Sequence, residues 1–471
     1  MVELNTVIFD VLYLLAAILF IMGIKKMGHP RTAVTGNLLG VVGMLLAAGV
    51  SFLITLENES IQNILTLPIG TIVGAIFIGT LFGTVLATRV QMTEMPQLVA
   101  VFNGVGGLAS VLVAAASLMA TKDSSIPVEV VVAGGVSGLI GAVTFVGSGV
   151  AAGKLQELNF FKKQLPIPTL IRHVLNLAML IGCGWCVFEM IDTGNALLYL
   201  VICVLGCALG YTLTTPIGGA DMPVVIALLN SYSGLAAAAT GFVVDQPVLI
   251  ISGSLVGASG VILTSLMCKA MNRSLLSVLF GGGMTSSYEQ DEGIYATVKR
   301  TTAEDVAMMV DFADRVVFVP GYGMAVAQAQ NAVSDLAAMI EQRGATVEYA
   351  IHPVAGRMPG HMNVLLAEAD VSYEQLRTLE EINPDFDEVD IAIVLGANDV
   401  VNPEARKEGT PVSGMPILNV DEARQVVVIK RSLSPGYAKI ANPLFAADNT
   451  SMLFGDGKAA IQDISAALKE L

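Results

Sequence analysis

The chain has 471 residues, of which 54% are hydrophobic and 14% charged, and its mean hydropathy is +0.70. In soluble domains about one quarter of the residues are charged, so the composition excludes a wholly soluble protein and indicates that much of the chain lies in lipid. The net charge of −15 argues against nucleic acid as a partner.

Nine apolar runs in residues 1–270 are each long enough to cross a bilayer as a helix. We therefore predict a polytopic α-helical membrane bundle of about nine spans. The spacing Gly253-x-x-x-Gly257-x-x-Gly260 lets helices approach closely, which predicts a compact and oligomeric bundle. The runs lie near residues 5–24, 35–56, 64–87, 95–119, 126–150, 171–190, 196–213, 222–244 and 247–268.

The loops between these runs carry a strong charge asymmetry. The ends of the runs that lie on one side of the bilayer are flanked by ten basic residues, whereas those on the opposite side are flanked only by Lys122. Because cytoplasmic loops are enriched in Lys and Arg, we expect the N-terminus outside and everything after Lys269 in the cytoplasm. The ten are Lys25, Lys26, Arg31, Arg89, Lys154, Lys162, Lys163, Arg172, Lys269 and Arg273.

Three polar residues stand out in the spans. Asn103 in the fourth span and Asn230 in the eighth each lie about 12 Å from the cytoplasmic end, which predicts that their amides reach one level. The two amides either form interhelical hydrogen bonds that serve packing or provide a polar step in an ion path. Asp221 stands at the cytoplasmic mouth of the eighth span, where it is either an N-cap or part of the same path.

The remainder of the chain has a different composition. Residues 281–293 are glycine-rich and then acidic, which is typical of a mobile tether, so residues 271–300 are predicted to be a linker. From 301 to 471, strand and helix patterns alternate, which predicts a cytoplasmic α/β, Rossmann-like domain with a doubly wound parallel sheet. Strands are expected at residues 315–319, 347–351, 391–395, 417–419, 426–429 and 452–454, and helices at 324–343, 362–369, 373–382 and 458–471.

A glycine fingerprint, Gly321-Tyr-Gly323, lies between the first strand and helix of this domain. Gly321 is expected to allow a tight turn, and Gly323 to let the backbone approach a pyrophosphate. The helix N-terminus is expected to offer unpaired N–H groups to the anion. Val326 occupies the third fingerprint position, where Gly or Ala is usual, so the match is imperfect.

The cofactor preference is indicated at two strand ends. An NAD-binding unit usually ends its second strand with a carboxylate, but here that strand runs into Ala350-Ile-His352-Pro353. Lys430, Arg431 and Ser432 end a later strand with two cations and a hydroxyl, which suits a phosphate dianion. A solvated basic pair would give the same sequence; we interpret these residues as the 2′-phosphate site of NADP.

Eight stretches occur in the order found in one known family: residues 219–223, 229–234, 320–330, 352–363, 396–399, 430–432, 442–445 and 453–456. On these stretches the chain resembles the β subunit of the proton-translocating NAD(P) transhydrogenase across nearly its whole length. The resemblance implies a multi-pass enzyme of the bacterial cytoplasmic (inner) membrane that couples hydride transfer between NAD(H) and NADP(H) to proton movement. Residues 1–270 would then be the proton-translocating domain and 301–471 the NADP(H)-binding domain.

The resemblance also implies roles for individual residues. Gly436 and Tyr437 lie in a loop that closes over the nucleotide, and Asp399 is a candidate for sensing protonation. Asp221 and Asn230 match positions linked to the proton path, and Asn103 stands where many members carry a histidine. The residues implied around NADP(H) are Gly321, Tyr322, Gly323, Met324, Ala325, Val326, Arg357, Asp399, Lys430, Arg431, Ser432, Gly436, Tyr437, Gly455 and Asp456.

One fingerprint and one phosphate site predict that the NAD(H) site lies on another polypeptide. The resemblance implies that this is the α subunit, which brings further membrane helices, and we expect a dimer of heteromeric protomers in lipid. No metal is expected, because the nicotinamide carries the chemistry of hydride transfer. The alternative is a membrane transporter or channel regulated by an NADP-sensing cytoplasmic domain.

Overall fold

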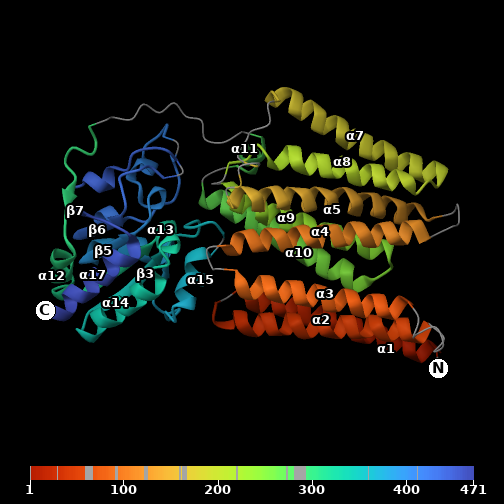
Figure 1. Cartoon of the computed structure of the whole chain (residues 1–471), viewed down its shortest axis with the longest axis horizontal. Coiled ribbons are helices and arrows are strands. Elements are labelled where there is room, and N and C mark those ends of the chain that lie inside the picture. Colours follow the sequence, from red (N-terminus) through yellow and green to blue (C-terminus); the bar gives the residue numbers. More distant parts are fainter. Residues whose placement is uncertain are drawn as a thin grey trace. The chain divides into compact units, whose positions relative to one another are not determined.

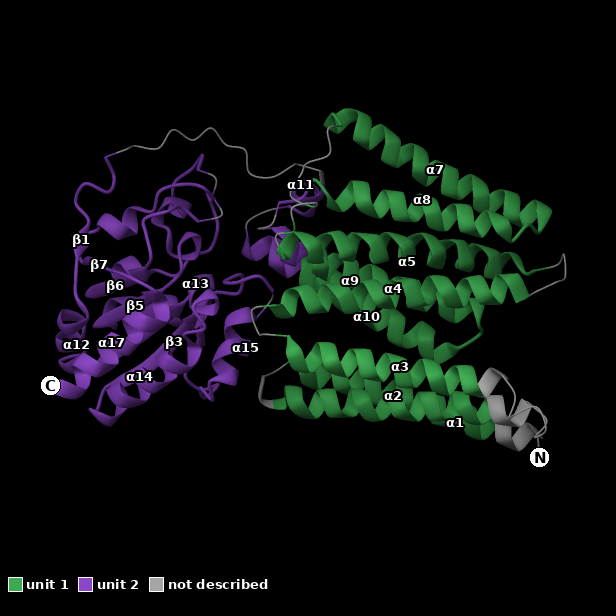
Figure 2. Cartoon of the chain, viewed as in Figure 1, with its two compact units in different colours: residues 1–216, 225–264 green, residues 217–224, 265–471 purple. Residues whose placement is uncertain are grey.

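A computed structural model covers the chain (Figure 1). It divides into two compact units: residues 1–216 with 225–264, and residues 217–224 with 265–471 (Figure 2). The structure describes residues 2–28, 30–58, 67–90, 94–120, 126–156, 158, 161, 167–218, 221–271, 274–280, 293–358, 360–410, 412–436 and 438–471.

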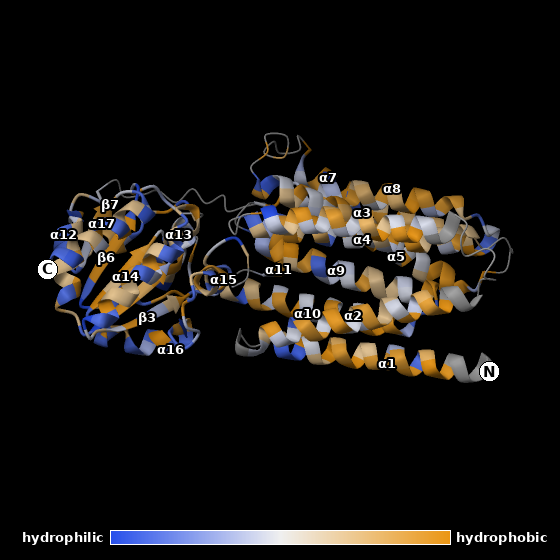
Figure 3. Cartoon of the chain, turned by 60° about the horizontal axis from the view of Figure 1, so that its bottom comes forward, coloured by the Kyte–Doolittle hydropathy of each residue, from blue (hydrophilic) through white to orange (hydrophobic). Residues whose placement is uncertain are grey.

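The first unit is a bundle of long apolar helices (Figure 3). Within the described residues, nine helices are long and apolar enough to cross a membrane, which confirms the predicted spans. The protein is therefore a multi-pass membrane protein. The nine are α1 (Val2–Met27), α2 (Pro30–Asn58), α3 (Leu67–Arg89), α4 (Met95–Ala120), α5 (Val128–Leu155), α7 (Thr169–Thr193), α8 (Leu197–Thr214), α9 (Met222–Val243) and α10 (Pro247–Ala270). A short helix follows, α11 (Leu275–Phe280).

Glycines bring neighbouring helices of this unit into backbone contact. A Cβ atom on Gly253 of α10 would lie 2.5 Å from the backbone nitrogen of Ala238 in α9. A Cβ on Gly107 of α4 would lie 2.7 Å from the carbonyl oxygen of Gly141 in α5. Real Cβ atoms cannot come so close, so these positions admit glycine alone, and the predicted close packing is confirmed.

The second unit contains a seven-stranded, wholly parallel sheet in the order β1-β7-β6-β5-β2-β3-β4. From β4 to β7 this is the strand order of two βαβαβ halves that meet between β2 and β5, and β1 extends the edge beyond β7. The prediction of a doubly wound sheet is confirmed. The strands are β1 (Lys299–Arg300), β2 (Arg315–Pro320), β3 (Thr346–Ile351), β4 (Leu376–Thr378), β5 (Ile391–Leu395), β6 (Gln425–Lys430) and β7 (Thr450–Phe454).

The helices of this unit are mostly short. Every residue of β5 is buried, as expected for a central parallel strand that is covered on both faces. The α-helices are α12 (Ala303–Asp311), α13 (Tyr322–Val326), α14 (Gln330–Gln342), α15 (His361–Glu368), α16 (Leu379–Ile382) and α17 (Gly457–Glu470). The 3₁₀ helices are η3 (Asn383–Glu388), η4 (Asp399–Val401), η5 (Pro403–Arg406), η6 (Val420–Glu422) and η7 (Pro443–Ala446).

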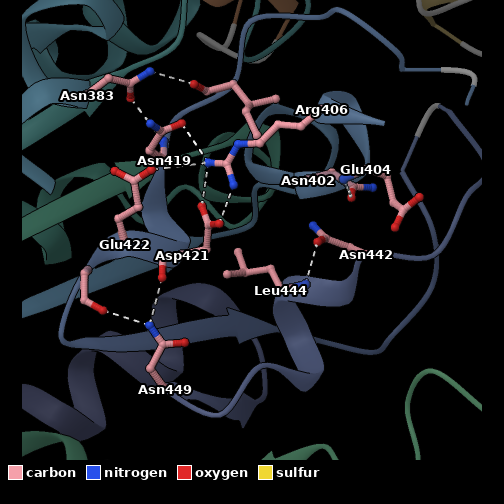
Figure 4. Close-up of polar contacts among 12 residues, drawn as sticks. Asn383, Asn402, Glu404, Arg406, Asn419, Asp421, Glu422, Asn442, Leu444 and Asn449 are labelled. Carbon is pink, nitrogen blue, oxygen red and sulfur yellow. Dashed lines mark hydrogen bonds and ion pairs between the residues drawn. The ribbon is translucent and has the colours of Figure 1, made fainter. Parts of the chain in front are cut away.

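The predicted strand at residues 417–419 is wrong. The Asn383 side chain bonds both ends of this segment: its Nδ2 donates to the Ile417 carbonyl at 2.8 Å, and its Oδ1 accepts from the Asn419 N–H at 3.0 Å. The neighbouring Arg406 donates to Asp421 and to the Asn419 side chain, as Figure 4 shows. These side-chain bonds, with one backbone bond from the Leu418 N–H to the Val400 carbonyl at 3.0 Å, satisfy the polar groups of this segment where a strand would use a ladder.

Two predicted helices also differ from the structure. The helix expected over 373–382 is reduced to α16, because residues 376–378 pair with β3 as β4. The helix expected over 324–343 breaks into α13 and α14, and between them Gln328 has a φ of 48°. A non-glycine residue in the left-handed region ends a helix, since it cannot continue the right-handed backbone. The strand β1 and the helix α12 were not predicted.

Candidate functional site

The loops that follow β2 and β5 meet at the point where the strand order reverses. A Cβ on Gly321 would lie 2.4 Å from the Ala397 nitrogen, and one on Gly396 would lie 2.3 Å from the Gly323 Cα. Gly396 also has a φ of +65°, whereas Gly321 is extended, with a φ of −118°. Gly321 is therefore needed for close approach of the two loops, and not for the tight turn that we expected.

The N–H groups of the fingerprint are largely used within the chain. The N–H of Gly321 donates to the Leu395 carbonyl at 2.9 Å, that of Gly323 to Gly396 at 3.0 Å, and that of Met324 to Gly321 at 3.0 Å. The expectation that the helix terminus offers several unpaired N–H groups is therefore wrong for these three. An anion placed here would draw less on these three amides and more on side-chain cations.

Val326 explains the imperfect third position of the fingerprint. In dinucleotide-binding folds that glycine allows close packing between helix and strand. Here α13 ends at Val326, whose side chain is 45% exposed and lines the cavity between the loops. The larger side chain therefore meets no strand, whereas Met324 and Ala325 are fully buried.

The loop between β3 and α15 brings a cation to the same cavity. The Arg357 guanidinium lies 4.5 Å from the centre of the Tyr322 ring, and both residues line the cavity. The backbone N–H of Arg357 donates to His361 Nδ1 at 2.9 Å. Burial, together with the Arg357 charge, lowers the pKa of His361 to about 4, so this imidazole is neutral and accepts the bond.

His352, at the start of that loop, is also neutral. Its Nδ1 accepts from the Val354 N–H at 3.3 Å, and its Nε2 donates to the Pro416 carbonyl at 2.8 Å. Burial lowers the pKa of His352 to about 4, despite the bond to Pro416. In the described residues no group of three or more His, Cys, Asp or Glu side chains could hold a metal ion.

The end of β6 supplies further positive charge. Lys430 donates to the Ser434 carbonyl, and its Nζ lies 5.0 Å from the centre of the Phe445 ring. Burial lowers the pKa of Lys430, and the Asp399 carboxylate opposes that shift. Within the described residues no carboxylate is in ion-pair distance of Lys430 or of the exposed Arg431, and Ser432 Oγ shares a 2.8 Å hydrogen bond with Ser434 Oγ.

Asp399, after β5, holds the segment that follows Lys430. Its Oδ2 accepts from the Ala438 N–H at 3.0 Å, and a Cβ on Gly436 would lie 2.5 Å from its Oδ1. Gly436 therefore lets the chain pass against the carboxylate. Tyr437 lies outside the described residues.

Gly455 and Asp456, after β7, complete the lining. The Gly455 N–H donates to the Lys430 carbonyl at 3.2 Å. Asp456 is the N-cap of α17, where its Oδ1 accepts from the N–H groups of Lys458 and Ala459 at 3.1 and 3.3 Å. The cavity thus gathers residues from five loops: Gly321, Tyr322, Gly323, Val326, Arg357, Asp399, Lys430, Arg431, Ser432, Gly436, Gly455 and Asp456.

The predicted polar residues of the membrane unit are brought together only in part. Asn103 Nδ2 donates to Ser148 Oγ of α5 at 2.9 Å, and both side chains are buried. Within the described residues Asn103 Oδ1 has no hydrogen-bond partner. Asn230 is half-buried, and one turn further along the two helices a Cβ on Gly106 would lie 3.2 Å from Ser233 Oγ.

Asp221 is buried, and its backbone N–H donates to the Gly218 carbonyl at 3.1 Å, just before α9 begins.

The whole chain is similar in sequence to known proteins. The sequence model of the family described as "NAD(P) transhydrogenase beta subunit" matches residues 9–467. Two relatives from Rhodospirillum rubrum, both named "NAD(P) transhydrogenase subunit beta", are 46% identical over 471 residues, or 97% of this chain and 98% of theirs.

The chain belongs to the NAD(P) transhydrogenase beta subunit family. This confirms the resemblance seen in the sequence. A transhydrogenase beta subunit belongs to an oxidoreductase that uses nicotinamide nucleotides, and it has an alpha subunit as a partner. Sequence reasoning missed the contacts of Phe445 and Ser434 with Lys430, because the stretch 442–445 gave no role for Phe445 and Ser434 lies in none of the eight stretches.

Proposed function

We propose that this beta subunit binds NADP(H) in the cavity between the β2 and β5 loops. We propose further that it couples hydride transfer, to or from NAD(H) on the alpha subunit, to proton translocation. One observation supports the choice of NADP(H) above all: Lys430 and Arg431 line the cavity without a carboxylate partner among the described residues. Cations kept free of ion pairs at a strand end are suited to a phosphate dianion.

The residues of the cavity fit this nucleotide. Lys430, Arg431 and Ser432 would hold the 2′-phosphate, the segment from Gly321 to Val326 would lie along the pyrophosphate, and Arg357 would add a third cation. The glycine contacts between the two loops leave a backbone-lined floor at the switch point, where such folds bind dinucleotides.

Other residues of the chain would orient and enclose the nucleotide. Asp399 holds the segment with Gly436 and Ala438 in place, and we propose that this segment, with Tyr437, closes over NADP(H) and responds to protonation of Asp399. Gly455 and Asp456 would fix the opposite wall. The nicotinamide itself supplies the hydride chemistry, so the chain need only bind, orient and exclude water.

We propose that Asp221, just before α9, and Asn230 and Asn103 in the membrane unit belong to the proton path. The unsatisfied Oδ1 of Asn103 favours a donor from outside the described chain, and we propose a histidine of an alpha-subunit helix. We further propose a bacterial cytoplasmic membrane location, with the N-terminus outside and residues 301–471 in the cytoplasm. The domain limits remain those predicted from sequence, 1–270, 271–300 and 301–471, in a dimer of heteromeric protomers.

Binding by the α/β region alone tests the cofactor assignment. Residues 290–471, produced separately, are expected to be soluble and to bind NADP(H) tightly, because the sheet and its core are complete within them. Titration calorimetry with NADPH and NADH is the measurement. A folded fragment that binds NADH as well as NADPH would contradict the proposal.

A further inference from the structure

The segment that joins the linker to the sheet packs against residues that support the proposed nucleotide site. Residues 295–300, which we call the tether end, follow the linker residues 281–292 in sequence. They run along residues 442–454, the stretch from the 3₁₀ helix η7 to the end of β7. Arg300 pairs with Met452 in the sheet, and its guanidinium lies 5.3 Å from the centre of the Phe454 ring.

Tyr295 makes the most specific contacts of the tether end. Its hydroxyl oxygen accepts a hydrogen bond from the Asn442 backbone N–H at 2.9 Å. Its ring stacks on Phe445 with centroids 6.4 Å apart and an interplanar angle of 20°. Further along, Thr297 Oγ1 donates to the Ala446 carbonyl at 3.4 Å.

Both residues that Tyr295 touches belong to the surroundings of the phosphate site. Phe445 is fully buried, and the Nζ of Lys430 lies 5.0 Å from its ring centre, on a cation–π contact. Asn442 is also fully buried, and its Nδ2 donates to the backbone carbonyl of Asn398, the residue before Asp399, at 3.1 Å. One side chain of the tether end therefore reaches the supports of both Lys430 and Asp399.

We propose that Tyr295 is a positioning residue that transmits the position of the tether end to Lys430 and Asp399. This rests on the proposed function, in which Lys430 binds the 2′-phosphate and the membrane unit moves protons. The contact is suited to the task because Tyr295 is half-buried, whereas Phe445 and Asn442 are fully enclosed. A shift of the tether end would displace Tyr295, and close packing would then pass the displacement to Phe445 and Asn442.

The test uses the full chain with its alpha subunit in sealed vesicles. The quantities measured are the rate of hydride transfer from NADPH to an NAD analogue and the protons moved per hydride. Tyr295→Leu removes the ring stack and the hydroxyl, and Tyr295→Phe removes the hydroxyl alone. We expect the proton-to-hydride ratio to fall about two-fold or more in Tyr295→Leu and by less in Tyr295→Phe, while hydride transfer continues.

Tyr349→Phe is the matched control. Tyr349 of β3 is a buried tyrosine of the same unit that stacks on Phe318, with centroids 5.6 Å apart, away from the tether end. The substitution Tyr349→Phe should leave the proton-to-hydride ratio unchanged. A ratio that is unchanged in both Tyr295 variants, or that falls equally in Tyr349→Phe, would overturn the proposal. If Tyr295→Leu does not fold, Tyr295→Phe decides, and wild-type vesicles that transfer hydride without moving protons would instead contradict the proposed function.

Discussion

Among the described residues of the first unit, which we call the membrane unit, the buried polar side chains at depth are amides and hydroxyls, whereas the α/β unit holds clusters of full charges. Ser137 and Thr240 share a 2.7 Å hydrogen bond while nearly fully buried, and Tyr199 donates to the Val111 carbonyl at 2.9 Å. In the α/β unit, by contrast, Arg315 pairs with Glu348 at 2.8 Å. An isolated charge is costly in lipid, and at depth the bundle therefore uses groups that bond without ionising.

The two units differ in the ionisable side chains that they hold near their polar residues. The α/β unit has ionisable side chains at its cavity, Asp399 and Lys430, and burial lowers the pKa of Lys430. At the level of Asn103 and Ser148, no described histidine or carboxylate hydrogen-bonds to either side chain. If the complex moves protons, either a titrating group from outside the described residues reaches this level or water alone carries the proton, and we favour a titrating group on the alpha subunit.

The largest expected effect follows from the lack of a described titrating side chain bonded to Asn103 or Ser148. Replacement of the intramembrane histidines of the alpha subunit by alanine should abolish proton pumping, because Asn103, Asn230 and Ser148 cannot titrate near neutral pH. Pumping is measured by dye quenching in sealed vesicles. Undiminished pumping would contradict the proposal that an alpha-subunit histidine titrates at the level of Asn103. Asn103→His in the deficient background should restore part of the activity if both positions face one cavity.

The second prediction probes the cations of the α/β unit. Replacement of Lys430 and Arg431 by alanine should weaken NADP(H) binding by on the order of 3 kcal/mol or more and leave NAD(H) binding little changed. NADP(H) alone carries the phosphate that these side chains would contact. Calorimetry on residues 290–471 gives both affinities.

A matched control separates local contact from net charge. Lys407 and Arg424 are two basic residues of the same unit, 68% and 69% exposed, that pair with Glu404 and Asp390. Their replacement by alanine removes the same charge away from the cavity and should leave NADP(H) affinity within about two-fold, since surface charges contribute little. Equal losses in both double variants would count against the phosphate site.

The third prediction concerns the glycine contact beneath the cavity. Gly396→Ala should destabilise the α/β unit by about 3 kcal/mol, because the new Cβ meets the Gly323 Cα at 2.3 Å and the residue also has a φ of +65°. Gly409→Ala is the control: Gly409 has a φ of +82° but open space around its Cβ. It should cost about 1 kcal/mol. Denaturant unfolding of residues 290–471 measures both, and equal costs would show that the contact is relaxed.

Much of the fold could be predicted because burial leaves a simple pattern in the sequence. Lipid requires long apolar runs, and strands covered on both faces, such as β2 and β5, are continuous apolar stretches. The misses have causes that the apolar pattern does not record. β1 is a two-residue strand, Lys299–Arg300, with no apolar pattern, and β4 depends on its pairing with β3. The apolar segment 417–419 was mistaken for a strand because the Asn383 bonds that hold it are long-range.

The candidate site could be predicted where charge ends a strand, as at Lys430 and Arg431. Its supports could not be predicted, because Phe445 and Asn398 reach it through tertiary contacts that leave no spacing in the sequence. The fingerprint glycines were found for one reason and are required for another. Their positions were predicted from backbone approach to a ligand, whereas the structure shows them in contact with a second loop.

The smallest expected effect tests the buried histidines of the α/β unit, for which the membrane unit has no described counterpart at depth. His352 can make both of its hydrogen bonds only as a neutral imidazole with its hydrogen on Nε2. Its pKa is lowered from 6.5 to about 4 in the folded state, so the unfolded state binds the proton more readily. The stabilisation is therefore fully present above pH 6.5 and is lost as the pH falls toward 4.

Between pH 7.5 and 5 this histidine should cost the folded state about 2 kcal/mol. In His352→Gln the amide nitrogen replaces Nε2 as donor to the Pro416 carbonyl and does not titrate, so the variant should lose less stability over that interval. The difference between wild type and variant isolates His352 from His361, whose lowered pKa acts in the same direction. Denaturant unfolding of residues 290–471 at a series of pH values measures this difference. Parallel curves for the two proteins would show that His352 does not carry the pH dependence.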